Sequence, residues 1–161
     1  MDKERILKRL NDIERYSKAL AGIVPNSYDE YEKSSITKAA VERYLQLISD
    51  LELEVLALVY KGLDLGLAGS EESLASKFEK LMSREAIEGF KERRALRNML
   101  VHAYFDMHYD KEAFEQASKL EDVEKLIKRD NKYDKTSKHS SGQAYRQARG
   151  ADAKLGNKIV K

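Results

Sequence analysis

Apolar residues recur every three or four positions through most of the chain, the spacing that one face of an α-helix produces. The first such stripe consists of Ile6, Leu10, Ile13, Tyr16 or Ser17, and Leu20. Gly22 and Pro25 follow and are expected to end this helix. Ser27 and Glu30 then have the spacing of a capping box, which predicts that a second helical region begins there.

The longest stripe consists of Ile36, Ala40, Tyr44, Leu47, Ile48, Leu51, Val55, Leu58 and Val59. Gly62 and Gly66 are its expected stops. Ser70 is predicted to cap a short third helix, and Ser83 to start a fourth. Asp110 is predicted to cap a fifth helix.

The last two helices have their own apolar stripes. In the fourth the inward positions are Ile87, Phe90, Ala95 or Leu96, Leu100 and Tyr104. In the fifth they are Phe114, Ala117, Val123, Leu126 and Ile127. No segment shows the sustained alternation of a β-strand. The pattern therefore predicts an all-α, up-and-down bundle of about five helices joined by short connections.

Charge divides the chain into two parts. The whole sequence has 30 Lys and Arg against 28 Asp and Glu, a net charge of +2. Residues 1–124 hold 19 basic and 25 acidic residues, a net charge of −6, whereas residues 125–161 hold 11 and 3, a net charge of +8. Few bulky apolar residues follow Tyr133, too few to offset the entropy of ordering. We expect a helical domain at 1–133 and a basic, disordered tail at 134–161, either native or added to the chain.

Several classes of protein are excluded by composition. The absence of cysteine excludes disulfides, a thiol nucleophile and thiolate metal sites. Charges throughout the first twenty residues do not fit a signal peptide, and the longest apolar run, Val55 to Tyr60, is far shorter than the ~20 residues that span a bilayer. The motifs of phosphate-binding loops, serine hydrolases and zinc proteases are missing. We expect a cytoplasmic protein without membrane contact, metal or cofactor.

One dense polar segment, from Lys91 to Asp106, stands late in the fourth predicted helix. On an ideal helix one row contains Arg94, Asn98 and His102, and a neighbouring row contains Arg93, Arg97 and Tyr104. Arginine binds phosphate oxygens at two points, and histidine exchanges protons near neutral pH. Together they could cleave RNA through its own 2′-hydroxyl without a metal. Arg97 and His102 lie ~140° apart around one helix, so a two-fold dimer would complete the site.

Each of these residues also has a structural interpretation. The arginines fit a solvated helix face or cations near a helix C-terminus. His102 fits the edge of a core, and Tyr104 fits a core aromatic residue with a solvated hydroxyl. Asp106 and Asp110 fit helix ends rather than a pair of metal ligands. Composition and spacing by themselves therefore also allow a purely structural bundle.

The string from Arg97 to Tyr104, Arg-Asn-Met-Leu-Val-His-Ala-Tyr, resembles the Arg-x4-His-x-Tyr motif of the HepT-like toxins, a branch of the HEPN ribonuclease superfamily. The long helix with its segment Ala40 to Leu45 and the order of the helices are also similar to that family. The resemblance covers residues 1–130 and leaves the basic tail outside. It implies a HEPN-like bundle that dimerises, so that two motifs form one cleft for metal-independent cleavage of RNA.

The resemblance also implies roles and partners. Arg97 and His102 would be catalytic, and a minimal nucleotidyltransferase of the MntA type would be the antitoxin of this type II toxin–antitoxin pair. That partner would transfer AMP to Tyr104 and so block the phosphate site. The expected substrate-binding residues are Lys91, Arg93, Arg94 and Asn98. The competing hypothesis is a non-catalytic helical module that binds nucleotide and a nucleotidyltransferase in the same cleft.

Overall fold

The structure is a computed structural model that describes residues 2–64, 69–78, 82–102, 109–120 and 123, all within one compact unit, Met1–Leu126. Within these residues there are six α-helices and no strand: α1 Lys3–Ile23, α2 Tyr28–Lys33, α3 Ser35–Gly62, α4 Glu71–Phe78, α5 Arg84–His102 and α6 Asp110–Ala117. The predicted all-α class is confirmed. The predicted boundary at 133 and the tail lie outside the described residues.

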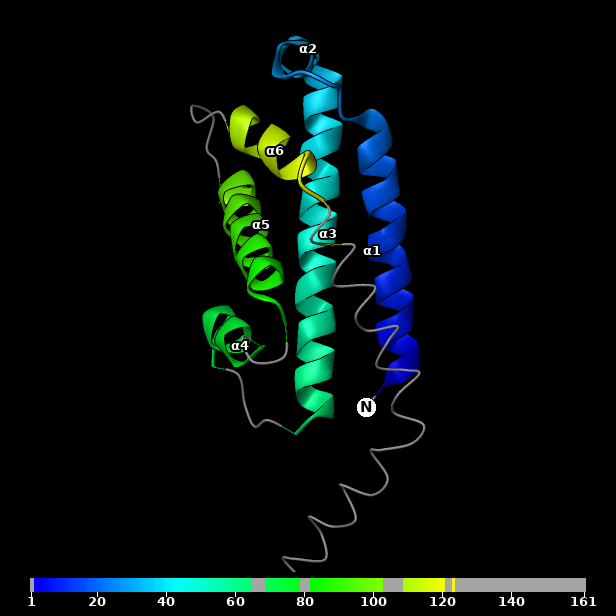
Figure 1. Ribbon diagram of the computed structural model, residues 1–161, viewed down its shortest axis with the longest axis vertical. Helices are drawn as coiled ribbons and strands as arrows, with labels where there is room; N and C mark the ends of the chain where they lie inside the picture. Colours follow the sequence, from blue (N-terminus) through cyan, green and yellow to red (C-terminus); the bar gives the residue numbers. More distant parts are fainter. Residues whose placement is uncertain (1, 65–68, 79–81, 103–108, 121–122, 124–161) are drawn as a thin grey trace, which may run out of the picture. The chain divides into compact units, whose positions relative to one another are not determined.

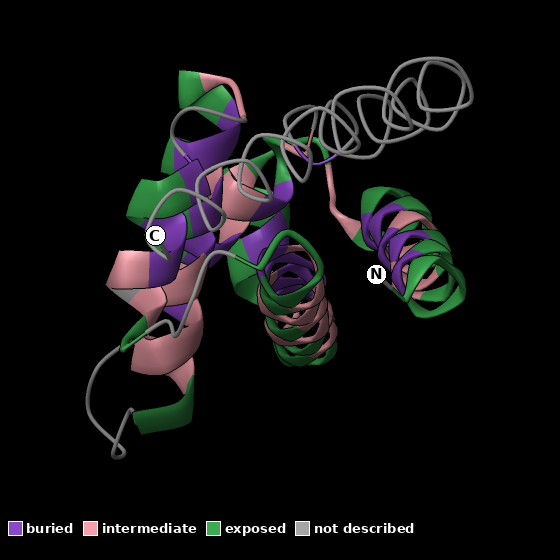
Figure 2. Ribbon diagram, turned by 90° about the horizontal axis from the view of Figure 1, so that it is seen from below, coloured by how far each residue is buried: buried purple, intermediate pink, exposed green. Residues whose placement is uncertain are grey.

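Helix α3 is the centre of the bundle. It contacts each of the other five helices of the described part, and α1 and α5 lie on opposite sides of it (Figures 1 and 2). The direction of the chain alternates from α1 to α3 to α5, which is the predicted up-and-down order (Figure 1). Because α5 runs antiparallel to α3, side chains of the two helices face each other over several turns.

The α1–α3 half of the core follows the predicted stripe in α1, but the stripe predicted for α3 was largely wrong: of its members only Ile48 and Val55 are buried, and Ile36 is 82% exposed. The buried residues of α1 are Ile6, Leu10, Ile13, Ser17 and Leu20. Those of α3 are Val41, Leu45, Ile48, Ser49, Glu52, Val55, Leu56 and Tyr60. Figure 2 shows these buried faces turned toward the inside of the bundle. Each fully buried Leu, Ile or Val contributes about 1.5–3 kcal/mol, so the inward stripe rather than helix propensity holds α1 on α3.

A second cluster fixes the start of α5. It consists of Leu56, Tyr60, Leu74, Ala75, Phe78, Ile87 and Phe90, from α3, α4 and α5. Further along α5, Leu96 rather than Ala95 is the buried member of the predicted stripe. This packing anchors the first turns of α5 and thereby sets the position of its later turns, which contain the candidate site.

Serine caps define most of the helix starts. Backbone N–H groups donate to the Oγ atoms of Ser27 at 3.4 Å, Ser70 at 3.1 Å and Ser83 at 3.3 Å, which confirms the three predicted starts. Ser34 caps α3 in the same way at 3.2 Å and separates it from the short α2. The end of α3 at Gly62 agrees with the predicted stop.

The predicted cap of the last helix was wrong. Helix α6 begins at Asp110 itself, and Tyr109 occupies the cap position without a side-chain hydrogen bond. The Asp110 carboxylate instead accepts a hydrogen bond from Nζ of Lys38 on α3, at 2.9 Å. A tertiary partner brought close by packing thus uses the side chain that local spacing had assigned to a cap, and it ties α6 to α3.

Candidate functional site

The candidate residues follow the last turns of α5. Because α5 is helical from Arg84 to His102, Arg97 and His102 differ by five residues at ~100° each and lie ~140° apart around its axis. Exposure rises along the row Arg94, Asn98 and His102: the first two are partly buried and His102 is exposed. Tyr104, the expected modification site, lies outside the described residues.

Arg93 is buried between α5 and α3. It donates to the Glu52 carboxylate from Nε at 2.9 Å and from Nη2 at 2.6 Å, and both side chains are 2% exposed. Two-point contacts of this kind are the strongest arginine–carboxylate pairs. The sequence placed Arg93 among the substrate-binding residues, but a side chain held inside the bundle offers no surface to RNA. We therefore assign it to the core.

Arg94 is held between two carboxylates. It donates from Nε and Nη2 to Glu71 at 2.7 and 2.6 Å, and from Nη1 to Asp50 at 2.8 Å. Its side chain is 14% exposed. The hydrogen bond from Arg94 holds the pKa of Glu71 below its ordinary value of 4.5, and the same contact raises the pKa of Arg94. Arg94 thus links α5 to α4 and α3 and has few donors left for a ligand.

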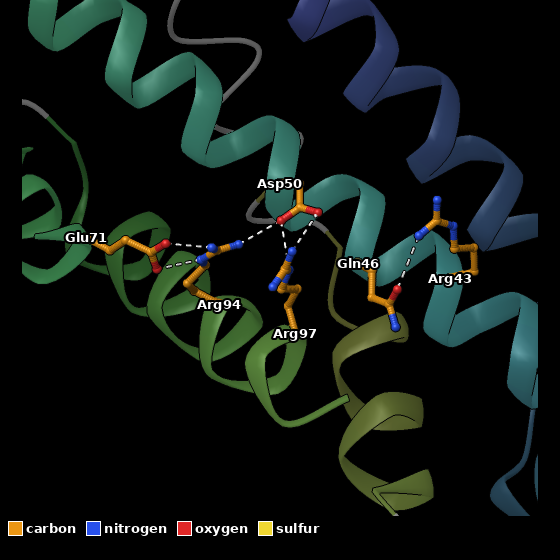
Figure 3. A network of polar contacts seen from close by, with 6 residues as sticks. All are labelled: Arg43, Gln46, Asp50, Glu71, Arg94 and Arg97. Atoms are coloured by element: carbon orange, nitrogen blue, oxygen red, sulfur yellow. Dashed lines mark hydrogen bonds and ion pairs between the residues drawn. The ribbon is translucent and has the colours of Figure 1, made fainter. Parts of the chain in front are cut away.

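Arg97 shares Asp50 with Arg94. Its Nε donates to Oδ1 of Asp50 at 2.9 Å and its Nη2 to Oδ2 at 3.3 Å. Figure 3 shows both arginines converging on Asp50 from α5. The Arg97 side chain is 24% exposed and that of Asp50 is 45% exposed. No described residue bonds to Nη1 of Arg97, so this side of the guanidinium can still donate to a phosphate.

These contacts change the expected electrostatics of the segment. By themselves the four cations Lys91, Arg93, Arg94 and Arg97 would give the segment a local positive field. In the structure each of the three arginines is paired with a carboxylate of α3 or α4, and Lys91 lies exposed on α5. The pairs largely offset the positive charge. A phosphate would be bound by the directed donors of Arg97 rather than by a net field.

Sequence reasoning missed the three carboxylates Asp50, Glu52 and Glu71. Glu52 had a detectable signal, because it lies four residues after Ile48 and three before Val55, within the buried stripe. A charge in such a position requires a buried partner. Asp50 and Glu71 lie at exposed and partly buried positions and give no such signal.

Across the described ranges, no group of three or more His, Cys, Asp or Glu side chains is arranged to hold a metal ion. In the same part of the chain no helix combines the length and the apolar character needed to cross a membrane.

Comparison with known proteins agrees with the helical architecture. A model of the family "Ribonuclease HepT-like" matches residues 6–129, which include Arg97, His102 and Tyr104. Among solved structures, a crystal structure of a toxin–antitoxin with AMP-PNP is similar in fold, with a TM-score of 0.66 and 18% sequence identity over 76% of this chain and 94% of the other. No curated protein matches. Because the family model matches most of its length, the chain belongs to the HepT-like ribonuclease family.

Proposed function

We propose that this chain is the toxin of a type II toxin–antitoxin pair and cleaves RNA without a metal, using Arg97 and His102. The observation that carries the proposal is that both side chains remain accessible to a ligand within a HepT-like ribonuclease domain. Arg97 is partly exposed with Nη1 unbonded by any described residue, and His102 is exposed at the end of the same helix. By contrast, Arg93 and Arg94 are occupied by Glu52 and Glu71.

The two side chains divide the chemistry. His102 takes the proton of the RNA 2′-hydroxyl while the 2′-oxygen attacks the adjacent phosphorus. Arg97 binds the phosphate oxygens and stabilises the charge that builds up on them. The bond from phosphorus to the 5′-oxygen then breaks, leaving a 2′,3′-cyclic phosphate; the 5′-oxygen takes a proton from water, and His102 returns to water the proton that it accepted. Asn98, between the two on α5, orients groups beside them, and Lys91 adds a positive charge nearby.

A second copy of the chain completes the cleft. The ~140° between Arg97 and His102 separates the two groups on one helix, whereas a two-fold axis would bring a second set to the same phosphate. Mixing the Arg97→Ala and His102→Ala proteins, each inactive alone, should restore part of the cleavage if the two copies share one cleft. A mixture that stays inactive while forming mixed dimers would contradict the shared cleft.

An antitoxin of the minimal nucleotidyltransferase class is the proposed protein partner. The similar crystal structure is of a toxin–antitoxin with AMP-PNP, an analogue of ATP, which supports both an antitoxin and nucleotide chemistry. Transfer of AMP to Tyr104 would add an anionic group to the motif that competes with RNA. Incubation with the partner and ATP should therefore raise the mass in steps of AMP. Unchanged labelling of the Tyr104→Phe protein would contradict this assignment.

Replacement of His102 distinguishes the ribonuclease from a non-catalytic nucleotide-binding module. In buffer with EDTA, the His102→Ala protein should cleave RNA at least ~100-fold more slowly than the wild type, the usual contribution of a general base. His139→Ala removes an imidazole outside the family match and is the matched control. If the His102→Ala protein cleaves as fast as the control, the catalytic assignment is wrong and the binding module is favoured.

A further inference from the structure

Asp50 occupies a central position among the arginines of α5. Its Oδ1 accepts from both Nη1 of Arg94 at 2.8 Å and Nε of Arg97 at 2.9 Å, and its Oδ2 accepts from Nη2 of Arg97 at 3.3 Å. Asp50 is nevertheless on the exposed face of α3. An exposed carboxylate without such partners would sample several rotamers, so these bonds fix its orientation.

A chain of contacts across three helices holds Asp50 in place. Glu71 of α4 binds one edge of Arg94 at two points, which leaves Nη1 of Arg94 directed at Asp50 (Figure 3). Glu71 and Arg94 therefore restrict the movement of Asp50, and Asp50 in turn restricts the movement of Arg97. The four groups carry two positive and two negative charges, so the network has no net charge to repel or attract RNA at a distance.

The contact with Asp50 leaves the useful side of Arg97 available. A guanidinium has donors on two edges, and each edge can bind a carboxylate or a phosphate at two points. Asp50 takes the edge formed by Nε and Nη2, and the edge that includes Nη1 has no described partner. The side chain is thus ordered before a phosphate arrives, which lowers the entropy lost at the transition state.

We propose that Asp50 is a positioning residue for Arg97 and that the Arg94–Glu71 pair holds Asp50 in place. Asp50 does not touch the substrate; it fixes the plane of the guanidinium that binds the scissile phosphate. The proposal rests on the proposed function, because it assigns Asp50 to the same cleavage site. The opposite role, in which Asp50 competes with phosphate for Arg97, predicts effects of the opposite sign.

Single-turnover cleavage of RNA in EDTA separates the two roles. Asp50→Asn keeps the shape of the side chain and removes its charge, and we expect it to lower the cleavage rate constant about 10-fold or more with little change in RNA affinity. Asp50→Glu should restore part of the rate. The control is Asp12→Asn on α1, since Asp12 also contacts two arginines, Arg9 and Arg15. Unchanged or faster cleavage by Asp50→Asn, or tighter binding of RNA, would overturn the proposal.

A spectroscopic readout tests the contact without any cleavage. The NMR signal of the Arg97 Nε–H group should be protected from solvent exchange in the wild type and in Asp12→Asn, lost in Asp50→Asn, and weakened in Glu71→Gln. An unchanged signal in Asp50→Asn would overturn the positioning role. If the wild type does not cleave RNA at all, the proposed function fails; if it cleaves and Asp50→Asn cleaves equally well, only this inference fails.

Discussion

Two arginine–carboxylate contacts join α3 and α5 within a short distance along each helix, and they differ in burial. Arg93 and Glu52 are both 2% exposed, whereas Arg97 and Asp50 are 24% and 45% exposed. The first pair is closed to solvent and has no surface for a ligand. The second is open on one side. The buried contact of Arg93 therefore stabilises the fold. The exposed contact of Arg97, one helical turn further along α5, orients a side chain that can still bind a ligand.

Removing one partner of the buried pair should have the largest effect on stability. In Arg93→Met the Glu52 carboxylate stays buried without its counter-charge, and such a change costs about 3–5 kcal/mol. Urea unfolding followed by circular dichroism measures this loss. The double variant Arg93→Met with Glu52→Leu should recover most of it, because an apolar pair of similar volume needs no counter-charge. A loss below about 1 kcal/mol in the single variant would contradict a structural role for Arg93.

The exposed contact should matter much less for stability. Asp50→Ala removes an interaction that solvent screens, and the free energy of unfolding should fall by no more than about 1 kcal/mol. Arg94 keeps its two-point contact with Glu71 in this variant. The same urea experiment, run beside Arg93→Met, gives the comparison directly. Equal losses in the two variants would remove the distinction between the two contacts.

The smallest expected effect is a dependence of stability on pH at Glu71. The Arg94 hydrogen bond lowers the folded-state pKa of Glu71 from its ordinary 4.5, so the folded state binds this proton less readily than the unfolded state. The stabilisation is fully present above pH 4.5 and is lost as the pH falls through the lowered folded-state pKa. The stability difference between the wild type and Glu71→Gln should therefore close on acidification. A difference that stays constant from pH 6 to pH 3 would show that Glu71 does not act through its charge.

Local signals in the sequence predicted the starts of the helices well, because caps act over a few residues; the buried face of α3 was predicted less well, because several neighbouring helices pack around it. Ser27, Ser70 and Ser83 cap the helices that they were expected to start. Asp110 failed as a cap since its partner, Lys38, is 72 residues away in the sequence. The order and class of the bundle followed from the local signals alone.

The candidate site was predicted only in part, for the same reason. The helical row of Arg94, Asn98 and His102 follows from spacing within α5, whereas the exposure of His102 was not predicted. The burial of Arg93 had a signal, since it lies three residues from both Phe90 and Leu96 on the inward stripe. The partners Asp50 and Glu71 are 47 residues from Arg97 and 23 from Arg94, and only the packing of α3 and α4 against α5 brings them close.

The role of Arg97 as the phosphate-binding residue is tested most directly by the rate of RNA cleavage by Arg97→Gln in EDTA, measured beside Arg15→Gln. Arg15 is an exposed arginine on α1 that also contacts an aspartate, Asp12, at 3.0 Å, so the two variants lose the same charge. We expect Arg97→Gln to remain folded and to cleave at least ~100-fold more slowly, while Arg15→Gln cleaves like the wild type. Cleavage by Arg97→Gln at the rate of Arg15→Gln would contradict the assignment of Arg97 as the phosphate-binding residue.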